Sequence, residues 1–566
     1  MSPVVTVQPV GTVSPIGIFS VGRPRLKRVV WRRLTVVFAR RTGPPRVPER
    51  GPSATLEGTC GEDTNPAIHD PARMGELWHS ADDWDYYTVP QPGAAGRNIH
   101  LPRGKVLGGS HSLNAMIWVR CVPQDFDHWA ALGNDGWAWN DVLPVYRDIE
   151  NFHGPGADNT ALHGTSGLLD VTSDYALSPI QQSIIDAAVE EGLPHNLDYN
   201  GAEIEGVSQQ QITARDGQRL NTYMAYLKPV RDQVRVEVGC HVHELIFADE
   251  AGLGDGAGSG TEAGSGAAAA GSGSPAAPRV VGVRYAQNGE VHELYADEVI
   301  LAAGAIDSPR LLLRSGIGPA DELAQHGIAS RADLPGVGKN LHDHLLAPVI
   351  FETETPVGPP QPGVSPAQTH LFWKSRAELD RPDTQPINFS VPMYGDNLAP
   401  RTGDGFSLMA GLITPAARGS ITLSGPNPED PLLIDLDALG HDDDLASLVA
   451  SVKQCRRIGS QRALAARPGE GGWGAVEVYP GPEIGDGDDL VEYVRNTVAT
   501  YHHQVGTCKM GVDDLAVVSP RLAVHGVNGL RVIDASVMPR VSTGNTNAPA
   551  VLIGELGAKF VLAGER

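Results

Sequence analysis

The sequence has few cysteines and no arrangement of them that would cross-link a fold or hold a metal ion. The five cysteines are odd in number, widely spread and without a Cys-x-x-Cys pair. They indicate neither a disulfide framework nor a metal site, and so fit a reducing compartment. No apolar run reaches transmembrane length, and the apolar-leaning residues 3–22 lack the preceding basic residues of a secretory signal. We therefore expect a cytoplasmic protein without a membrane span.

Positive charge is also scarce. The net charge of −23 over 566 residues argues against nucleic-acid binding, which requires a basic surface. Residues 23–50 are the exception, because they hold ten basic residues and one acid among scattered proline and glycine. This composition is typical of a basic, partly disordered arm. From Gly61 onward the sequence is that of an ordinary globular protein, long enough for two or three domains.

Two glycine-containing stretches favour a nucleotide-binding domain. Residues 103–118 contain the pair Gly108-Gly109, small polar residues and then an apolar segment, which suits a backbone that closely approaches a flat or phosphorylated ligand. A turn leading into a buried helix is the alternative interpretation. Residues 298–318 predict a buried strand followed directly by a helix, with Ser308 as its cap, Pro309 as its first residue and Gly316 at its end. Strand, turn and helix in this order are typical of a doubly wound sheet.

The rest of the pattern predicts a further pair of strands and a second lobe. Segments 234–248 and 280–302 alternate as strands do, so the Gly-, Ala- and Ser-rich stretch 252–278 is interpreted as a flexible insertion within one sheet. Helices are expected at 176–192, 442–459 and 489–500, and strands at 387–393, 405–413 and 420–423. Residues 346–495 therefore indicate a lobe built on an antiparallel sheet.

Histidine and asparagine occur together near the C-terminus. His502 and His503 lie within residues 501–511, while Asn545 and Asn547 follow a strand-like run at 530–533. An imidazole beside a neutral amide can take a proton from an alcohol and hold the resulting oxyanion. A cofactor must then accept the hydride. Without further context, a hydrogen-bonded loop histidine and turn asparagines explain the same residues.

Other residues that could carry chemistry are interpreted as structural. Cys508 is expected to pack as a small residue, because nothing in the sequence lowers its pKa. His342 and His344 lack the additional ligands of a metal site and are expected to pack and to join domains. Trp373 and Tyr394 could line an aromatic pocket, although packing explains them equally. No metal ligand set is predicted.

Four of these stretches together resemble the glucose-methanol-choline (GMC) oxidoreductases: residues 104–118, 304–318, 334–344 and 501–549. The resemblance runs from about Gly61 to the C-terminus. It implies an α/β fold, with a doubly wound, Rossmann-like FAD-binding domain and an interleaved α+β substrate domain on an antiparallel sheet. The implied boundaries are 61–160, 205–345 and 500–566 for the FAD-binding domain, and 161–204 and 346–499 for the substrate domain.

The resemblance also implies an activity and its residues. The expected reaction is FAD-dependent oxidation of a small-molecule alcohol to an aldehyde or ketone, by hydride transfer to flavin N5, with oxygen or a quinone-like molecule as final electron acceptor. His503 matches the catalytic base and Asn545 its partner, and His502 is expected to point away because neighbouring side chains alternate in extended backbone. The implied cofactor contacts are Glu57, Arg103, Gly108, Gly109, Asn114, Ala115, Met116, Ile117, Val242, Gly304, Asp534, Ala535, Asn547 and Ala548.

The sequence departs from the family at two places. His111 stands where a small residue is usual, and Leu113 occupies the position at which some members attach FAD covalently, so non-covalent FAD is expected. No Gly-x-Gly occurs before residue 100, although the family opens with Gly-x-Gly-x-x-Gly and Glu57 is the one candidate for the adenosine ribose. We therefore interpret residues 1–60 as a degenerate or frame-shifted start of the nucleotide-binding domain. A flavin-dependent lyase and an FAD-deficient, non-catalytic protein are the alternative functions.

Overall fold

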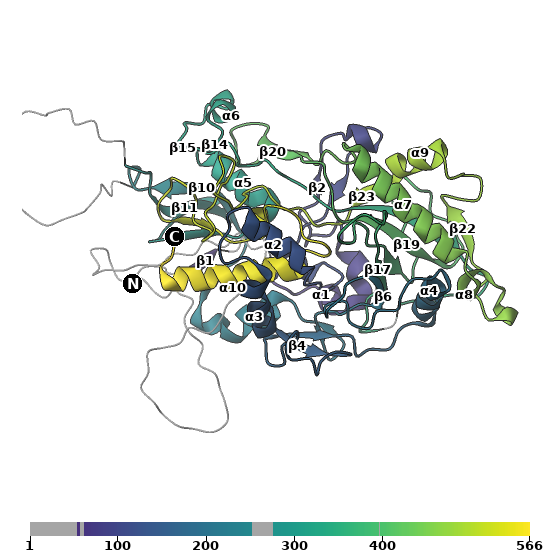
Figure 1. The fold of residues 1–566 in the computed structure, drawn as a ribbon. Helices are drawn as coiled ribbons and strands as arrows, with labels where there is room; N and C mark the ends of the chain where they lie inside the picture. The colour runs from purple at the N-terminus through teal and green to yellow at the C-terminus, as the bar shows by residue number, and fades with distance from the viewer. Residues whose placement is uncertain (1–53, 57–60, 252–275, 361, 396) are drawn as a thin grey trace, which may run out of the picture.

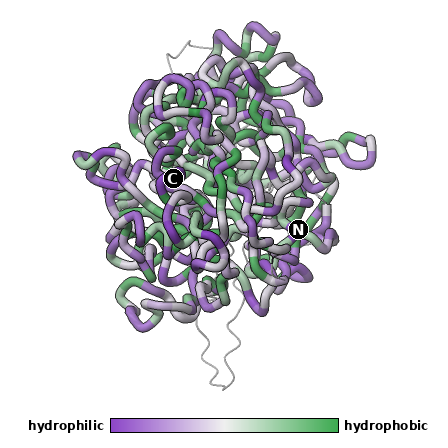
Figure 2. The backbone as a smooth tube through the Cα atoms, turned by 90° about the vertical axis from the view of Figure 1, so that its right-hand side faces the viewer, coloured by the Kyte–Doolittle hydropathy of each residue, from purple (hydrophilic) through white to green (hydrophobic). Residues whose placement is uncertain are grey.

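The computed structural model describes residues 54–56, 61–251, 276–360, 362–395 and 397–566. Glu57, the basic segment 23–50 and most of the 252–278 insertion lie outside the described residues. Figure 1 shows two lobes, one with the long C-terminal helix α10 (Asn547–Ala563) and one with helix α7 (Asp442–Gly459) over a sheet. In Figure 2 hydrophobic segments run through the interior, while hydrophilic segments dominate the outer loops.

The second lobe is built on an antiparallel sheet, as predicted. Its strands lie in the order β22, β16, β19, β18, β17 and β6, and β23 also pairs with β16. These strands are β6 (Gly206–Gln209), β16 (Leu345–Glu352), β17 (Ala367–Phe372), β18 (Ile387–Phe389), β19 (Gly405–Leu412), β22 (Val476–Tyr479) and β23 (Ala499–Thr500). Strand β6 pairs with β17 in this sheet, so the sheet begins within the segment 205–345 that the sequence assigns to the FAD-binding domain.

Strand β19 explains how this sheet serves two purposes. Phe406, Leu408 and Ala410 join the apolar cluster that contains Leu448 of α7. Because strand side chains alternate, the intervening Met409 lies on the opposite face, where it lines a cavity. One face of the sheet therefore packs on helix α7, and the other is available for a site.

The first lobe contains the predicted strand–turn–helix unit. Strand β13 (Val299–Leu301) pairs in parallel with β24 (Leu530–Val532) and leads into helix α5 (Gly304–Arg314). Strands β10 (Cys240–Phe247), β11 (Val280–Gln287) and β12 (Glu290–Tyr295) form an antiparallel sheet against which α5 packs. The flanks of the 252–278 insertion are thus neighbouring strands, as predicted. Strand β1 (Ala54–Leu56) pairs in parallel with β9 (Arg235–Glu237).

Two predicted helix ends are wrong. Ser308 is not the cap of α5, because the helix begins four residues earlier at Gly304, and the Ser308 hydroxyl instead accepts from Ala303 N and donates to Asp534. Gly316 follows the helix end with φ +79°, as expected for a glycine in that place. Helix α9 (Asp488–Thr497) ends before residue 500, because Ala499 and Thr500 pair with β16 instead. Helix α7 has its predicted bounds.

The other elements cover these sheets or shape short turns. The helices are α1 (Pro66–His69), α2 (Pro123–Ala131), α3 (Trp139–Ile149), α4 (Pro179–Glu190), α6 (Ala320–Gln325) and α8 (Arg462–Ala465). The short strands are β2 (Tyr86–Tyr87), β3 (His100–Leu101), β4 (Glu150–His153), β5 (Leu169–Thr172), β7 (Ala214–Arg215), β8 (Gln218–Arg219), β14 (Ile317–Gly318), β15 (Ala332–Asp333), β20 (Ser420–Leu423) and β21 (Leu432–Asp435). None of the helices in the described ranges is long and apolar enough to cross a membrane.

Candidate active site

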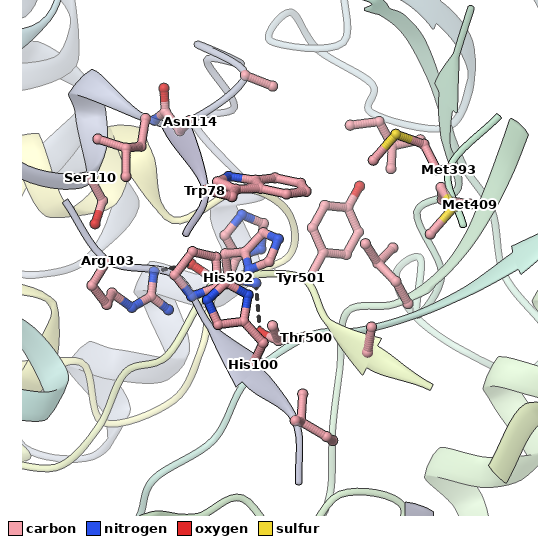
Figure 3. Close-up of a pocket in the computed structure, with 18 of the residues that line it drawn as sticks. Trp78, His100, Arg103, Ser110, Asn114, Met393, Met409, Thr500, Tyr501 and His502 are labelled. Atoms are coloured by element: carbon pink, nitrogen blue, oxygen red, sulfur yellow. Dashed lines mark hydrogen bonds between the residues drawn. The ribbon is translucent and has the colours of Figure 1, made fainter. Parts of the chain in front are cut away.

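A cavity of about 340 Å³ lies where residues of the two lobes meet. One wall carries Arg103, Ser110 and Asn114, and the facing side carries Met393 and Met409, as Figure 3 shows. We call the first the polar wall. It comprises Arg103, Ser110, Asn114, His503 and Asn545. We call the second the apolar wall. It comprises Leu346, Ile387, Phe389, Met393 and Met409.

Both predicted catalytic residues line this cavity, and they contact each other. His503 Nε2 lies 3.2 Å from Asn545 Nδ2, although the two residues are 42 positions apart in the sequence. Each is largely buried, with exposed fractions of 8% and 7%. Tyr501 stacks on the His503 ring at a centroid distance of 4.7 Å. The imidazole is therefore held flat in a site with little access for bulk water.

The prediction that His502 points away from the site is wrong. His502 lines the same cavity as His503. The prediction assumed extended backbone, but His502 has φ +67°, so the alternation of side chains breaks at this residue. Its carbonyl oxygen accepts a hydrogen bond of 2.9 Å from Arg103 Nη1, and its ring lies 5.2 Å from that of Trp78. His502 thereby ties the histidine loop to the polar wall.

Gln385 fixes the orientation of the Asn545 amide. Gln385 Nε2 donates to Asn545 Oδ1 at 2.9 Å, which leaves Asn545 Nδ2 to donate toward His503 Nε2. A ring nitrogen that accepts this bond carries no proton. The network therefore assigns the His503 proton to Nδ1 and leaves a lone pair on Nε2 at the cavity.

His344 completes this assignment from the other side of the ring. His344 Nδ1 lies 3.0 Å from His503 Nδ1, so His503 donates and His344 accepts. Burial lowers the pKa of His344 to about 3, which keeps this imidazole neutral and able to accept. His503 is thus held between two neutral partners, in the tautomer that a general base requires.

Asp343 anchors the backbone of the histidine loop. Its carboxylate accepts a hydrogen bond of 2.7 Å from His503 N and further bonds from the Thr500 hydroxyl and the Gln504 amide. Burial raises the pKa of Asp343 to about 6, although these donors and the charge of Arg103 oppose the rise. The residue acts on the position of His503 and does not itself line the cavity.

The predicted cofactor residues fall into two groups. Those that line the cavity are Arg103, Asn114, Ala115, Ile117, Asp534, Ala535 and Asn547. Those that do not are Gly108, Gly109, Met116, Val242, Gly304 and Ala548. In the second group Gly108 and Gly109 form a left-handed turn, with φ of +90° and +56°, directly before Ser110, which lines the cavity. An added Cβ at Gly104 would lie 2.2 Å from the Gly109 backbone, so this loop requires glycine.

Hydrogen-bond donors that line the cavity fit the carbonyl oxygens and ring nitrogens of a flavin. Arg103, Asn114 and Asn547 supply guanidinium and amide N–H groups. The first turn of α10 also lines the cavity through Asn547 and Ala550, and the N-terminus of a helix favours negative charge. His111 is buried at the same wall, with Nε2 2.8 Å from Thr213 Oγ1 and 3.1 Å from Asn547 Nδ2, while Leu113 lines the cavity.

Other sequence predictions have structural outcomes. His342 is buried, its Nε2 accepts from Val541 N at 2.7 Å and its Nδ1 lies 2.7 Å from Asn340 O, so it packs as expected but joins two loops of one predicted domain. Burial raises the pKa of the Cys508 thiol well above its ordinary value, which fits a packing role. Tyr394 lines the cavity, whereas Trp373 does not.

Sequence reasoning missed the roles of Gln385, His344 and Asp343. His344 and Asp343 lie in the 334–344 block, which was recognised as a motif but interpreted as packing. Gln385 lies just before β18 in the second lobe, where no motif marks it. A search for buried amides and imidazoles near the motif residues would have required knowledge of the tertiary contacts.

Comparison with known proteins identifies the family of the chain. GMC oxidoreductase family domains match residues 46–346 and 415–554. The chain is 34% identical over 532 residues to an alcohol dehydrogenase (acceptor) of Pseudomonas putida, covering 88% of this chain and 89% of the relative. It is also 34% identical over 527 residues, with the same coverage, to an oxygen-dependent choline dehydrogenase of Brucella ovis.

Solved structures show the same fold. Pyridoxine 4-oxidase from Mesorbium loti superposes with a TM-score of 0.79 at 30% identity, covering 91% of this chain and 95% of that chain. A formate oxidase variant from Aspergillus oryzae superposes with a TM-score of 0.77 at 23% identity, covering 90% and 93%. The family matches span more than half of the chain, and the site retains a histidine and a donor-rich wall. The chain therefore belongs to the GMC oxidoreductase family, as an FAD-dependent oxidoreductase that acts on CH–OH groups.

Proposed function

We propose that the protein oxidises an apolar alcohol to an aldehyde or ketone, with His503 as general base and Asn545 as hydrogen-bond donor to the alcohol oxygen. The observation that carries this proposal is the contact of 3.2 Å between His503 Nε2 and Asn545 Nδ2 at the cavity wall. A lone pair and an N–H group at one point are what the oxygen of an alcohol needs as it loses its proton.

The chain's own residues handle the proton. The alcohol hydroxyl donates to His503 Nε2, and His503 becomes a cation whose Nδ1–H remains bonded to neutral His344. Asn545 Nδ2 moves its hydrogen bond from the imidazole to the developing alkoxide. Bound FAD supplies the acceptor for the hydride that leaves the carbinol carbon. The final electron acceptor is proposed to be oxygen or a quinone-like molecule.

An apolar substrate is favoured over a quaternary ammonium alcohol. Leu346, Ile387, Phe389, Met393 and Met409 offer the substrate an aliphatic, aromatic and thioether surface. Among the described residues that line the cavity, Asp534 is the sole carboxylate, and it accepts bonds from Gly304 N, Ser308 Oγ and Ser536 N. Arg97 and Arg103 add positive charge to the lining. We therefore do not expect choline to be the preferred substrate, although one relative is named a choline dehydrogenase.

Anaerobic reduction of the flavin tests the activity. The purified protein should be yellow, and mixing it with a primary alkanol should bleach the flavin band at about 450 nm. General-base catalysis contributes roughly 10²–10⁴-fold, so His503→Ala should slow the bleaching by that factor. 1-Hexanol should give a higher kcat/KM than choline.

His502→Ala is the matched control, because His502 lines the same cavity but is not bonded to Asn545. It should lose much less than His503→Ala; an equal or larger loss would assign the base to His502. A yellow protein that no alcohol bleaches would favour a lyase, and a colourless protein would show that FAD is not retained. A preference for choline over 1-hexanol would contradict the apolar substrate class alone.

A further inference from the structure

Arg219 is a buried cation that lacks a carboxylate partner. Its side chain ranks with those of Arg120 and Arg531 among the largest that the interior holds. Arg120 Nη1 lies 3.0 Å from Glu150 Oε1, which balances its charge. Arg531 Nε lies 2.8 Å from Glu298 Oε1. Arg219, which is 1% exposed, forms no ion pair with any carboxylate in the described part of the chain. A buried charge without a partner is costly to the fold, so we expect it to act on a charged ligand.

The hydrogen bonds of Arg219 leave its charge uncompensated. Its Nε donates to Ile68 O at 2.7 Å, and its Nη1 donates to His111 O at 3.1 Å and to Asn114 O at 2.5 Å. Its Nη2 is buried and has no hydrogen-bond partner among the described residues. Burial lowers the pKa of Arg219 to about 9, so the guanidinium is still charged at neutral pH. The positive charge is therefore balanced neither by an acid nor by contact with solvent.

Asn114 connects this charge to the cavity. Asn114 Oδ1 accepts from Arg219 Nη1 at 3.0 Å and from Met116 N at 2.9 Å. Asn114 belongs to the polar wall, where Figure 3 shows it beside Ser110, whereas Arg219 does not line the cavity. Because two donors hold Oδ1, the amide N–H₂ of Asn114 is the end left for a ligand. Arg219 thus fixes the amide from behind the wall.

We propose that Arg219 raises the reduction potential of the bound flavin, by holding an unpaired positive charge behind Asn114. The hydride that leaves an alcohol brings one negative charge to the cofactor. A fixed positive charge in surroundings of low dielectric constant stabilises that negative charge more than it would in water. Arg219 is therefore a positioning residue, which orients the Asn114 amide and acts on the cofactor through the wall.

The midpoint potential of the flavin in the full-length, FAD-loaded protein tests this assignment. It is measured by chemical reduction in equilibrium with a reference dye. Arg219→Gln keeps a hydrogen-bond donor but removes the charge, whereas Arg219→Lys keeps both. Arg219→Gln should lower the ratio of reduced to oxidised flavin at least about tenfold, which is about 30 mV for a two-electron couple. Arg219→Lys should lose less than half of that shift.

Arg215→Gln is the matched control. Arg215 lies on β7, which pairs with the strand of Arg219, but its side chain is 52% exposed and is paired with Asp170. The same change of charge at this place should leave the midpoint potential as in the wild type. Chemical reduction involves neither an alcohol nor His503, so failure of the proposed alcohol chemistry would leave this test intact.

Asn114→Asp tests the same charge without altering Arg219. It preserves Oδ1 with its two donors and places a carboxylate against the guanidinium, so the potential should fall at least as far as in Arg219→Gln. Circular dichroism and flavin content establish that each variant is folded and loaded. A wild-type potential in Arg219→Gln would overturn the assignment. If that variant does not retain FAD, a wild-type potential in Asn114→Asp overturns it instead. Equal decreases in Arg219→Gln and Arg219→Lys would also overturn it, because lost packing and not lost charge would then be the cause.

Discussion

The two walls of the cavity are stabilised in different ways. On the polar wall, His503 and Asn545 keep their positions through a directed chain of contacts with Gln385 and His344. On the apolar wall, Met393 and Met409 project from the antiparallel lobe without any such chain to one another. Hydrogen bonds are directional and hold individual atoms in place, whereas apolar contacts depend on how much surface is buried and how well the cavity is filled. Changes to the polar wall should therefore alter the chemical step, and changes to the apolar wall should alter substrate preference.

The strongest test of this difference is a substitution at a residue that supports the polar wall without lining the cavity. Gln385→Leu removes the donor to Asn545 Oδ1, so the amide can turn and present its oxygen to His503. One neutral hydrogen bond contributes about 0.5–1.5 kcal/mol, which predicts up to about tenfold slower flavin reduction. Asn545→Ala removes the direct donor and should cost about 10²-fold, as loss of an oxyanion donor does.

The rate of anaerobic flavin bleaching at saturating alcohol measures both effects. Asn388→Leu is the matched control, because it removes a buried amide of the neighbouring strand that bonds to Thr369 and not to Asn545. It should leave the bleaching rate per bound flavin unchanged. If Gln385→Leu raises KM without slowing the bleaching, the amide does not act through Asn545.

The two walls also differ in how much of each could be predicted from the sequence. The resemblance of residues 501–549 to the GMC family implied that His503 and Asn545 would act as a pair, and they lie in contact. Their supports were beyond prediction, because the contact of Gln385 with Asn545 joins positions 160 residues apart in different lobes. His502 was misjudged because a single left-handed residue reverses the direction of a side chain.

For the apolar wall, the sequence predicted the strands but not which of their side chains line the cavity. The alternation at 405–413 predicted strand β19 and the antiparallel lobe, since alternation is a local property. Which face of that strand meets the cavity depends on where helix α7 packs, and the sequence pattern does not contain that choice. The dinucleotide end is different again, because Glu57 and the residues before Ala54 lie outside the described residues.

Acid should weaken the support of the polar wall and leave the apolar wall unaffected. Burial lowers the pKa of His370, whose Nδ1 lies 3.3 Å from Gln385 Nε2, to about 3. The pKa of a histidine in the unfolded chain is about 6.5. Because the folded chain keeps His370 neutral, this residue contributes stability above that pH, and the contribution is lost as the pH falls toward 3. Between pH 7 and 5 the loss is about 2 kcal/mol.

The measurement is the unfolding free energy from urea titrations at pH 7 and pH 5, followed by flavin fluorescence. His370→Phe removes the titrating group but keeps a ring against Tyr199 and Phe372. The variant should lose about 2 kcal/mol less than the wild type between the two pH values. Asp343 acts in the opposite direction, since burial raises its pKa to about 6 and its protonation at lower pH favours the folded state. An identical pH dependence in wild type and variant would contradict the assignment to His370.

Another substitution affects the apolar wall alone. Met409→Gln keeps the length of the side chain but replaces a thioether that lines the cavity with an amide. Loss of part of one apolar contact, at about 25 cal/mol per Å², predicts a decrease of about three- to tenfold in kcat/KM for 1-octanol. Ethanol is the internal control, because it is too short to reach across the cavity once its hydroxyl is bound at His503. Its kcat/KM and the bleaching rate at saturating 1-octanol should remain unchanged, since the directed contacts of the polar wall are intact. An equal loss for both alcohols would mean that Met409 supports the chemical step, and that the two walls are not separable.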